Sequence, residues 1–183
     1  MTTKLSVAAR NAMANALTTT IGASPSLLIF DGTRPTNITD ADAGTVLATM
    51  TLPATPIGAA SAGAISKSGT WEDASADAAG YAKYYRIKQG ATVHYEGLCA
   101  QNWAASTAYV VGQQVARNGL VYRCTTAGTS ASSGGPSGTG TGITDGSAVW
   151  AYQGVADLIL DNTNIAAGQG VTINSWSYTR GNA

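Results

Sequence analysis

The residues of this sequence that could carry acid–base or metal chemistry are one histidine and ten carboxylates. His94 is the single histidine, and Glu96 follows it two positions later in "TVHYEG". General acid–base catalysis and zinc binding usually combine a histidine with further histidines or with carboxylates at set spacings. No HExxH or similar spacing surrounds His94. We therefore interpret His94 as a strand residue at a surface or subunit contact.

The carboxylates could form a calcium site or a glycosidase pair, but their spacing is more typical of turns and caps. A calcium loop supplies alternating oxygen ligands from one short loop, and glycoside hydrolysis needs two carboxylates that flank one bond. No EF-hand spacing is present, and Asp beside Gly, Thr and Ser usually closes a turn. The acids to which we assign such a structural role are Asp40, Asp42, Glu72, Asp73, Asp77, Asp157 and Asp161.

Other catalytic motifs are missing from the sequence. The glycines of "SSGGPSGTGTG" lack both the GK[ST] sequence and the strand–turn–helix context of a phosphate loop. No serine stands in G-x-S-x-G, and no Cys/His pairing is indicated. The sequence therefore predicts no catalytic residue, no cofactor and no metal ligand, and we expect that the protein is not an enzyme.

The charge balance disfavours two classes of partner. Ten basic and ten acidic residues cancel, and charged residues make up only 11% of the chain. A neutral surface gives no electrostatic reason to expect nucleic acid or an anionic membrane as the main partner. The composition, rich in Thr, Ser, Gly and Ala, suits short strands, tight turns and contacts with other subunits.

The apolar runs and the cysteines indicate where the chain is assembled. Runs such as "SLLIF" are too short to span a membrane, and "MTTKLSVAARNAMANAL" lacks the continuous apolar core of a signal peptide. We therefore expect assembly in a cytoplasm. Two cysteines in that compartment are usually reduced, so Cys99 and Cys124 are predicted to be free thiols, with a bridge between them as the alternative.

The elements that must position these residues are one helix followed by many short strands. Apolar residues at helical spacing predict an amphipathic helix over 4–21, with Arg10, Asn11 and Asn15 on its other side. Short β-type runs follow, separated by turn residues, and two of them form a hairpin near Gly90. We predict a mainly β fold: a jelly-roll-like antiparallel β-sandwich with an N-terminal α-helix. The helix residues expected to make assembly contacts are Leu5, Ala9, Ala12, Met13 and Leu17.

An aromatic and glycine-rich stretch interrupts the strand pattern. The runs "VHYEGLCA" and "VADLILDNT" could be strands of one sheet, with residues 101–153 inserted between them. An insertion is cheap when its two ends lie close together. We therefore expect a β-sandwich core made of 1–100 and 154–183, and a small three-stranded β-unit over 101–153, called the inserted module below.

The inserted module resembles small modules attached to chitinases and related secreted hydrolases. Its aromatic and glycine residues follow the order W-x5-Y-x2-G-x2-V-x3-G-x2-Y…W. Similar modules occur in tail and structural proteins of tailed bacteriophages. A unit this small needs large side chains to bury enough area. The residues expected to form its core are Trp103, Tyr109, Val115, Tyr122 and Trp150.

Sugar binding by such a module would require an exposed aromatic face. In the chitinase-type modules an exposed aromatic follows the second Tyr strand, whereas this chain has "CTTAGTSASSGGPSG" at that place. The departure removes the main stacking group and favours a scaffold or contact module over an active lectin. Tyr152 is the best remaining candidate for a glycan contact.

The rest of the chain resembles a family of small virion structural proteins of tailed bacteriophages. The resemblance lies in "KLSVAARNAMANALTTTIG", "SLLIFDGTRPTN" and "ADLILDNTNIAAGQGVTINSWSYTRG". It implies a capsid decoration or cement protein that stabilises the head by bridging subunits. Its partners would be the major capsid protein and copies of itself, and its location the virion. The alternatives are a tail or baseplate component whose inserted module contacts host glycans, and a free polysaccharide-binding or hydrolytic accessory protein.

Overall fold

The computed structural model describes residues 4–181, which form one helix and sixteen strands. The helix is α1 (Val7–Ile21). The strands outside the inserted module are β1 (Ser26–Phe30), β2 (Val46–Thr51), β3 (Ala64–Ser66), β4 (Glu72–Asp73), β5 (Gly80–Tyr81), β6 (Tyr84–Gln89), β7 (Thr92–Asn102), β14 (Leu158–Leu160), β15 (Asn164–Ile165) and β16 (Val171–Thr179). Those within it are β8 (Ala108–Tyr109), β9 (Gln114–Arg117), β10 (Leu120–Thr126), β11 (Gly128–Thr129), β12 (Ile143–Asp145) and β13 (Ala148–Val155).

Helix α1 begins three residues later than the predicted 4–21 because Ser6 caps it. The Ser6 hydroxyl accepts a hydrogen bond from the amide of Ala9 at 3.1 Å, which satisfies one of the free N–H groups of the first turn. Gly22, at φ +75°, ends the helix and its amide donates to the carbonyl of Thr18. No helix within residues 4–181 is long and apolar enough to cross a membrane.

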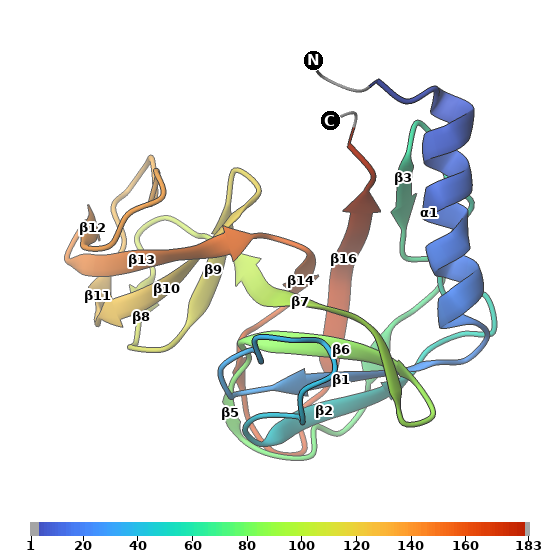
Figure 1. The fold of residues 1–183 in the computed structure, drawn as a ribbon. Helices are drawn as coiled ribbons and strands as arrows, with labels where there is room; N and C mark the ends of the chain where they lie inside the picture. Colours follow the sequence, from blue (N-terminus) through green and yellow to red (C-terminus); the bar gives the residue numbers. More distant parts are fainter. Residues whose placement is uncertain (1–3, 182–183) are drawn as a thin grey trace.

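Polar side chains hold α1 against the loop before β3. Asn11 Oδ1 accepts from the amide of Gly63 at 2.7 Å, and Asn15 Oδ1 accepts from the amide of Ala60 at 2.9 Å. Only Ala14 and Ile21 of the helix are fully buried. Figure 1 shows α1 standing beside β3 at one side of the molecule. Apolar residues of α1 consequently face outward, and these are Val7, Ala8, Ala12, Met13 and Ala16.

The predicted mainly β fold with an N-terminal helix is confirmed, and its strands form a sandwich. One layer has the order β2-β1-β6-β7 with antiparallel pairs throughout. The β6–β7 hairpin turns at Gly90, as predicted. The other layer contains β14 and β16, which also pair antiparallel. Alternating side chains of the two layers meet in one hydrophobic core, as in other sandwiches. Its members include Leu27, Ile29, Met50, Ile87, Leu158, Leu160, Ile173 and Trp176.

An aromatic cluster closes the end of this core. Trp176 packs edge-on against Tyr95 at 5.4 Å between centroids, and its indole Nε1 donates to the hydroxyl of Tyr85 at 2.6 Å. The Trp176 ring also lies 5.6 Å from that of Trp71. Large rings supply much of the buried area in a small sandwich.

Strand β7 belongs to the sandwich and to the inserted module at once. Its first half pairs with β6, while its last residues pair in parallel with β14 on one side and β9 on the other. Leu158 lies opposite Cys99, and Val115 lies opposite Gln101. The runs "VHYEGLCA" and "VADLILDNT" therefore do become neighbours in one sheet, as expected. The module boundaries 101 and 153 themselves stay a prediction.

Candidate functional site

The inserted module has a hydrophobic cluster of its own. Strands β9, β10, β13 and β12 form its sheet, and β8 pairs with β11 beside it. The Trp150 ring meets that of Tyr109 edge-on at 5.0 Å between centroids. All five residues predicted for its core come together here. The cluster comprises Tyr109, Val115, Tyr122, Cys124, Ala148 and Trp150, with Trp103 half-buried against it. The sequence pattern had not singled out Cys124 and Ala148, because small residues carry no spacing signal of their own.

Trp103 is held as a structural side chain at the edge of this cluster. Its indole Nε1 donates to Asp145 Oδ2 at 2.8 Å, and the guanidinium of Arg117 lies over its ring at 4.9 Å. A Cβ on Gly135 would come within 3.0 Å of the same ring. These contacts occupy the surfaces with which Trp103 could stack on a sugar.

The glycine-rich stretch folds back over the module instead of forming a phosphate loop. The hydroxyl of Tyr122 donates to the carbonyl of Gly138 at 3.0 Å, and the amide of Tyr152 donates to the carbonyl of Gly140 at 3.0 Å. Arg117 Nε donates to the carbonyl of Gly134 at 2.7 Å. Gly134 and Gly138 have positive φ angles that favour glycine.

Comparison with protein families gives one match within the chain. Residues 102–150 match carbohydrate-binding module family 5/12. The match covers about a quarter of the chain and coincides with the cluster of the inserted module. Comparisons with curated proteins and with solved structures gave no match. The carbohydrate-binding-like module expected from the resemblance to chitinase-type modules is therefore confirmed, and such a module is a non-catalytic unit.

The surface of the inserted module carries no freely exposed ring. Within residues 4–181, which include every Trp, Tyr and Phe of the chain, all aromatic side chains are buried or half-buried. Tyr152 is half-buried and packs edge-on against Tyr122 at 6.2 Å. The exposed large apolar side chains of the module are two valines, Val110 and Val111. Recognition of a sugar here would therefore depend on polar groups more than on ring stacking.

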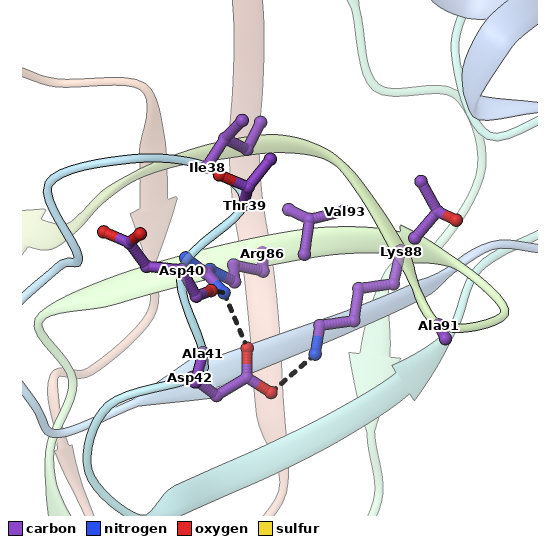
Figure 2. Close-up of a pocket in the computed structure, with 10 residues that line it drawn as sticks. Ile38, Thr39, Asp40, Ala41, Asp42, Arg86, Lys88, Ala91 and Val93 are labelled. Atoms are coloured by element: carbon purple, nitrogen blue, oxygen red, sulfur yellow. Dashed lines mark hydrogen bonds and ion pairs between the residues drawn. The ribbon is translucent and has the colours of Figure 1, made fainter.

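One hollow lies on the sandwich and is lined by paired charges. It has a volume of about 400 Å³ and is bounded by the loop before β2 and by the β6–β7 hairpin. Figure 2 shows Arg86 and Lys88 directed at the carboxylate of Asp42. Arg86 Nη1 lies 2.9 Å from Asp42 Oδ1 and also donates to the carbonyl of Asp40, while Nη2 lies 2.9 Å from Glu96 Oε2. Because each charge has a partner, this hollow fixes the loop and offers little to a ligand.

Hydrogen bonds and ion pairs from Lys88 and Arg86 set the ionisation of Asp42. Partial burial raises the pKa of its carboxyl, but the two cations outweigh burial and the pKa is lowered from 3.8. Asp42 is therefore ionised throughout the neutral range, consistent with a structural ion pair.

The other acids take structural positions. Asp73 and Asp77 both accept hydrogen bonds from Thr49, and Asp161 Oδ1 accepts from the amide of Asn162. Asp40 closes a turn at Asn37. Burial raises the pKa of Asp157, and Glu72 lies exposed at an edge. Within residues 4–181 no group of three or more potential ligands could hold a metal ion.

His94 and the two cysteines also lie in structural positions. His94 is half-buried on β7. Cys99 is buried in the sandwich core and Cys124 in the module cluster, and both are free thiols. Burial raises the pKa of both thiols, that of Cys99 strongly. Neither thiol is therefore placed or ionised for nucleophilic chemistry.

Two further hollows adjoin each other where the module meets the sandwich. They have volumes of about 190 and 330 Å³ and share Lys83 and Arg123. The smaller is also lined by Thr33, Arg34 and Gln153, and the larger by Val111 and Gly112 among others. We call the two together the junction groove. Sequence reasoning missed this groove, because Arg34, Lys83 and Arg123 lie far apart along the chain.

Proposed function

We propose that the protein is a non-catalytic structural protein that attaches a β-sandwich body to a glycan through its inserted module. The observation that carries the proposal is the match of residues 102–150 to a carbohydrate-binding module family over a unit with its own hydrophobic cluster. The shared strand β7 joins that unit directly to the sandwich. The shared strand fixes the orientation of the module, and of any glycan bound to it, relative to the sandwich. A fixed orientation suits a protein that attaches one body to another better than a protein that binds glycans free in solution.

The finer proposal places this protein in the virion of a tailed bacteriophage. The resemblance of the sandwich segments to virion structural proteins supports it, and a glycan-binding module would favour a tail or baseplate position from which the module reaches the host surface. The partners would then be neighbouring tail proteins and host polysaccharide. The virion location and these partners rest on the resemblance alone.

Binding to insoluble polysaccharides tests the glycan proposal. We expect the full chain to sediment with at least one member of a panel that contains chitin, cellulose and a crosslinked polyuronate. Tyr152→Ala should weaken this binding about tenfold if the half-buried ring contributes to the contact. Tyr178→Ala, a half-buried tyrosine of the sandwich, is the matched control and should bind as the parent chain does. Absence of binding to every member of the panel would contradict the proposal.

A second candidate function is capsid decoration, and the outward apolar face of α1 favours it. Met13 is 48% exposed, and Ala12 and Ala16 lie beside it on the same face. A flat face of small residues permits close approach of another subunit and carries no repelling charge. The major capsid protein and further copies of this chain would be the partners.

Incorporation into purified particles tests this second candidate. We expect Met13→Glu to lower the amount of the chain in particles by about tenfold or more, because it places a charge in a contact that excludes water. Thr139→Glu adds the same charge at an exposed position of the module and should leave incorporation unchanged. A copy number that matches capsid lattice sites would support decoration, whereas the few copies of a tail component would exclude it.

A further inference from the structure

The junction groove gathers positive charge that the fold does not use. Arg34, Lys83 and Arg123 come from the loop after β1, the segment before β6 and strand β10, and all three line the smaller hollow. No ion pair to any of the three occurs within residues 4–181, where only Arg86 and Lys88 are paired. No acidic residue lines either hollow.

The other basic side chains show how this groove differs from the rest of the surface. Arg10 Nη1 donates to the carbonyl of Ala62, Lys67 Nζ to the carbonyl of Gly69, and Arg117 stacks on an indole ring. With the ion-paired Arg86 and Lys88, five of the ten basic residues thus support the fold. Lys4 and Arg180 are exposed near the two ends of the described chain.

Three like charges around one hollow raise the energy of the folded state unless an anion enters. The charges of the two half-buried side chains, Lys83 and Arg123, are screened less by water than those of fully exposed side chains. Asp157 is an acid that feels the charge of Arg34: its pKa is raised mainly by burial although Arg34 acts to lower it. Asp157 makes no ion pair with Arg34 among the described contacts and does not line the groove. The cationic site is therefore open to an oxyanion from outside.

We propose that the junction groove binds the carboxylate of an acidic polysaccharide, with Arg123 and Lys83 as the main anion contacts and Arg34 at the rim. The inference rests on the glycan-binding function proposed above and names the class of glycan. A guanidinium binds a carboxylate through two parallel hydrogen bonds, and an ammonium adds a point charge. Val111, 58% exposed beside the larger hollow, offers an apolar contact to the face of a sugar ring.

The shape of the groove and the absence of free rings favour a glycan over a nucleic acid. Single-stranded nucleic acid is bound by extended basic channels with aromatic side chains on which bases stack. Here the cations surround one small hollow, the chain has no net charge, and no ring within residues 4–181 is exposed. Because Arg123 lies within the module and Lys83 outside it, both parts of the molecule build the site.

The test compares two double variants of the full chain that change the net charge equally. Lys83→Gln with Arg123→Gln removes two charges from the groove, and Lys4→Gln with Arg180→Gln removes two charges elsewhere. Binding to soluble polygalacturonate is measured by titration calorimetry at low and moderate salt, alongside dextran sulfate, a short oligonucleotide and free glucuronate. Thermal unfolding of each variant shows that it is folded.

We expect the parent chain to bind polygalacturonate more weakly as salt rises, and the groove variant to lose about tenfold or more in affinity. The control variant should stay within about twofold of the parent, since distant surface charges contribute little. Equal losses in both variants, or tighter binding to the oligonucleotide or to free glucuronate, would overturn the inference. Tighter binding of dextran sulfate than of polygalacturonate would show that the groove prefers sulfate groups, and would overturn the inference that it binds a carboxylate.

The outcomes separate this inference from the proposed function. Retained binding to chitin or cellulose with no binding to polygalacturonate would overturn the acidic-glycan inference and leave the glycan-binding function standing. Failure with every glycan would overturn both. Binding to polygalacturonate that the groove variant loses and the control keeps would support both.

Discussion

Replacing Trp150 by Ala is expected to destabilise the inserted module by about 3–5 kcal/mol. Trp150 is fully buried, and its ring packs edge-on against Tyr109. Removing it leaves a cavity in a cluster of only six buried residues, which has few neighbours able to close it. A small core gains too little from its other contacts to offset such a loss.

The measurement is hydrogen exchange of the full chain, read segment by segment. Backbone amides of β9, β10 and β13 should lose protection in Trp150→Ala, while those of β1, β2 and β6 should keep it. Trp150→Phe is the matched control, since it keeps most of the ring and removes an indole N–H that has no partner; it should cost much less. Loss of protection across the sandwich as well would show that residues 101–153 are not a separate folding unit.

Replacing Arg86 by Met is expected to lower the free energy of unfolding by about 3 kcal/mol. The Arg86 side chain is 1% exposed, and it holds Asp42, Glu96 and the carbonyl of Asp40 together. Removing one partner of a buried ion pair leaves the others without compensation and usually costs about 3–5 kcal/mol. We take the lower end because Asp42 is 32% exposed and water screens it.

The same network makes a prediction about pH. The folded-state pKa of Asp42 lies below its ordinary value of 3.8, so its contribution to stability is fully present above about pH 4 and is lost as the pH falls through the folded pKa. The free energy of unfolding of the parent chain, measured with denaturant, should fall as the pH is lowered through this acidic range. In Arg86→Met the free energy of unfolding should depend less on pH. Lys88→Met should reduce the pH dependence as well, because Lys88 also lowers the pKa of Asp42, but it leaves the buried guanidinium in place and should cost about 1 kcal/mol or less. An equal pH dependence in the parent and in Arg86→Met would contradict this role.

The sequence predicted those features whose signals are local. The helix, the hairpin at Gly90 and the aromatic spacing of residues 102–150 each depend on neighbours within a few tens of residues. The start of α1 was placed too early because a capping hydroxyl at Ser6 overrides the apolar pattern that precedes it.

Features that depend on distant residues were not predictable in this way. Arg86 and Asp42 lie 44 positions apart, and the three cations of the junction groove come from separate segments. The parallel pairing of β7 with β9 and β14 has no periodic signature in the sequence. The alanines of α1 face outward because Asn11 and Asn15, on the opposite side of the helix, accept hydrogen bonds from backbone amides of the loop before β3.

Strand β7 has a mechanical consequence for attachment. It is a single eleven-residue strand that carries backbone hydrogen bonds to β6 at one end and to β9 at the other. A pull on the module along the axis of β7 would load the six residue pairs between β7 and β6 in shear, so that these bonds resist together, whereas two residue pairs join β7 to β9. If the module binds a glycan as proposed above, its weaker bonds to that ligand would break before these strand pairs, and the protein would dissociate intact and be able to rebind.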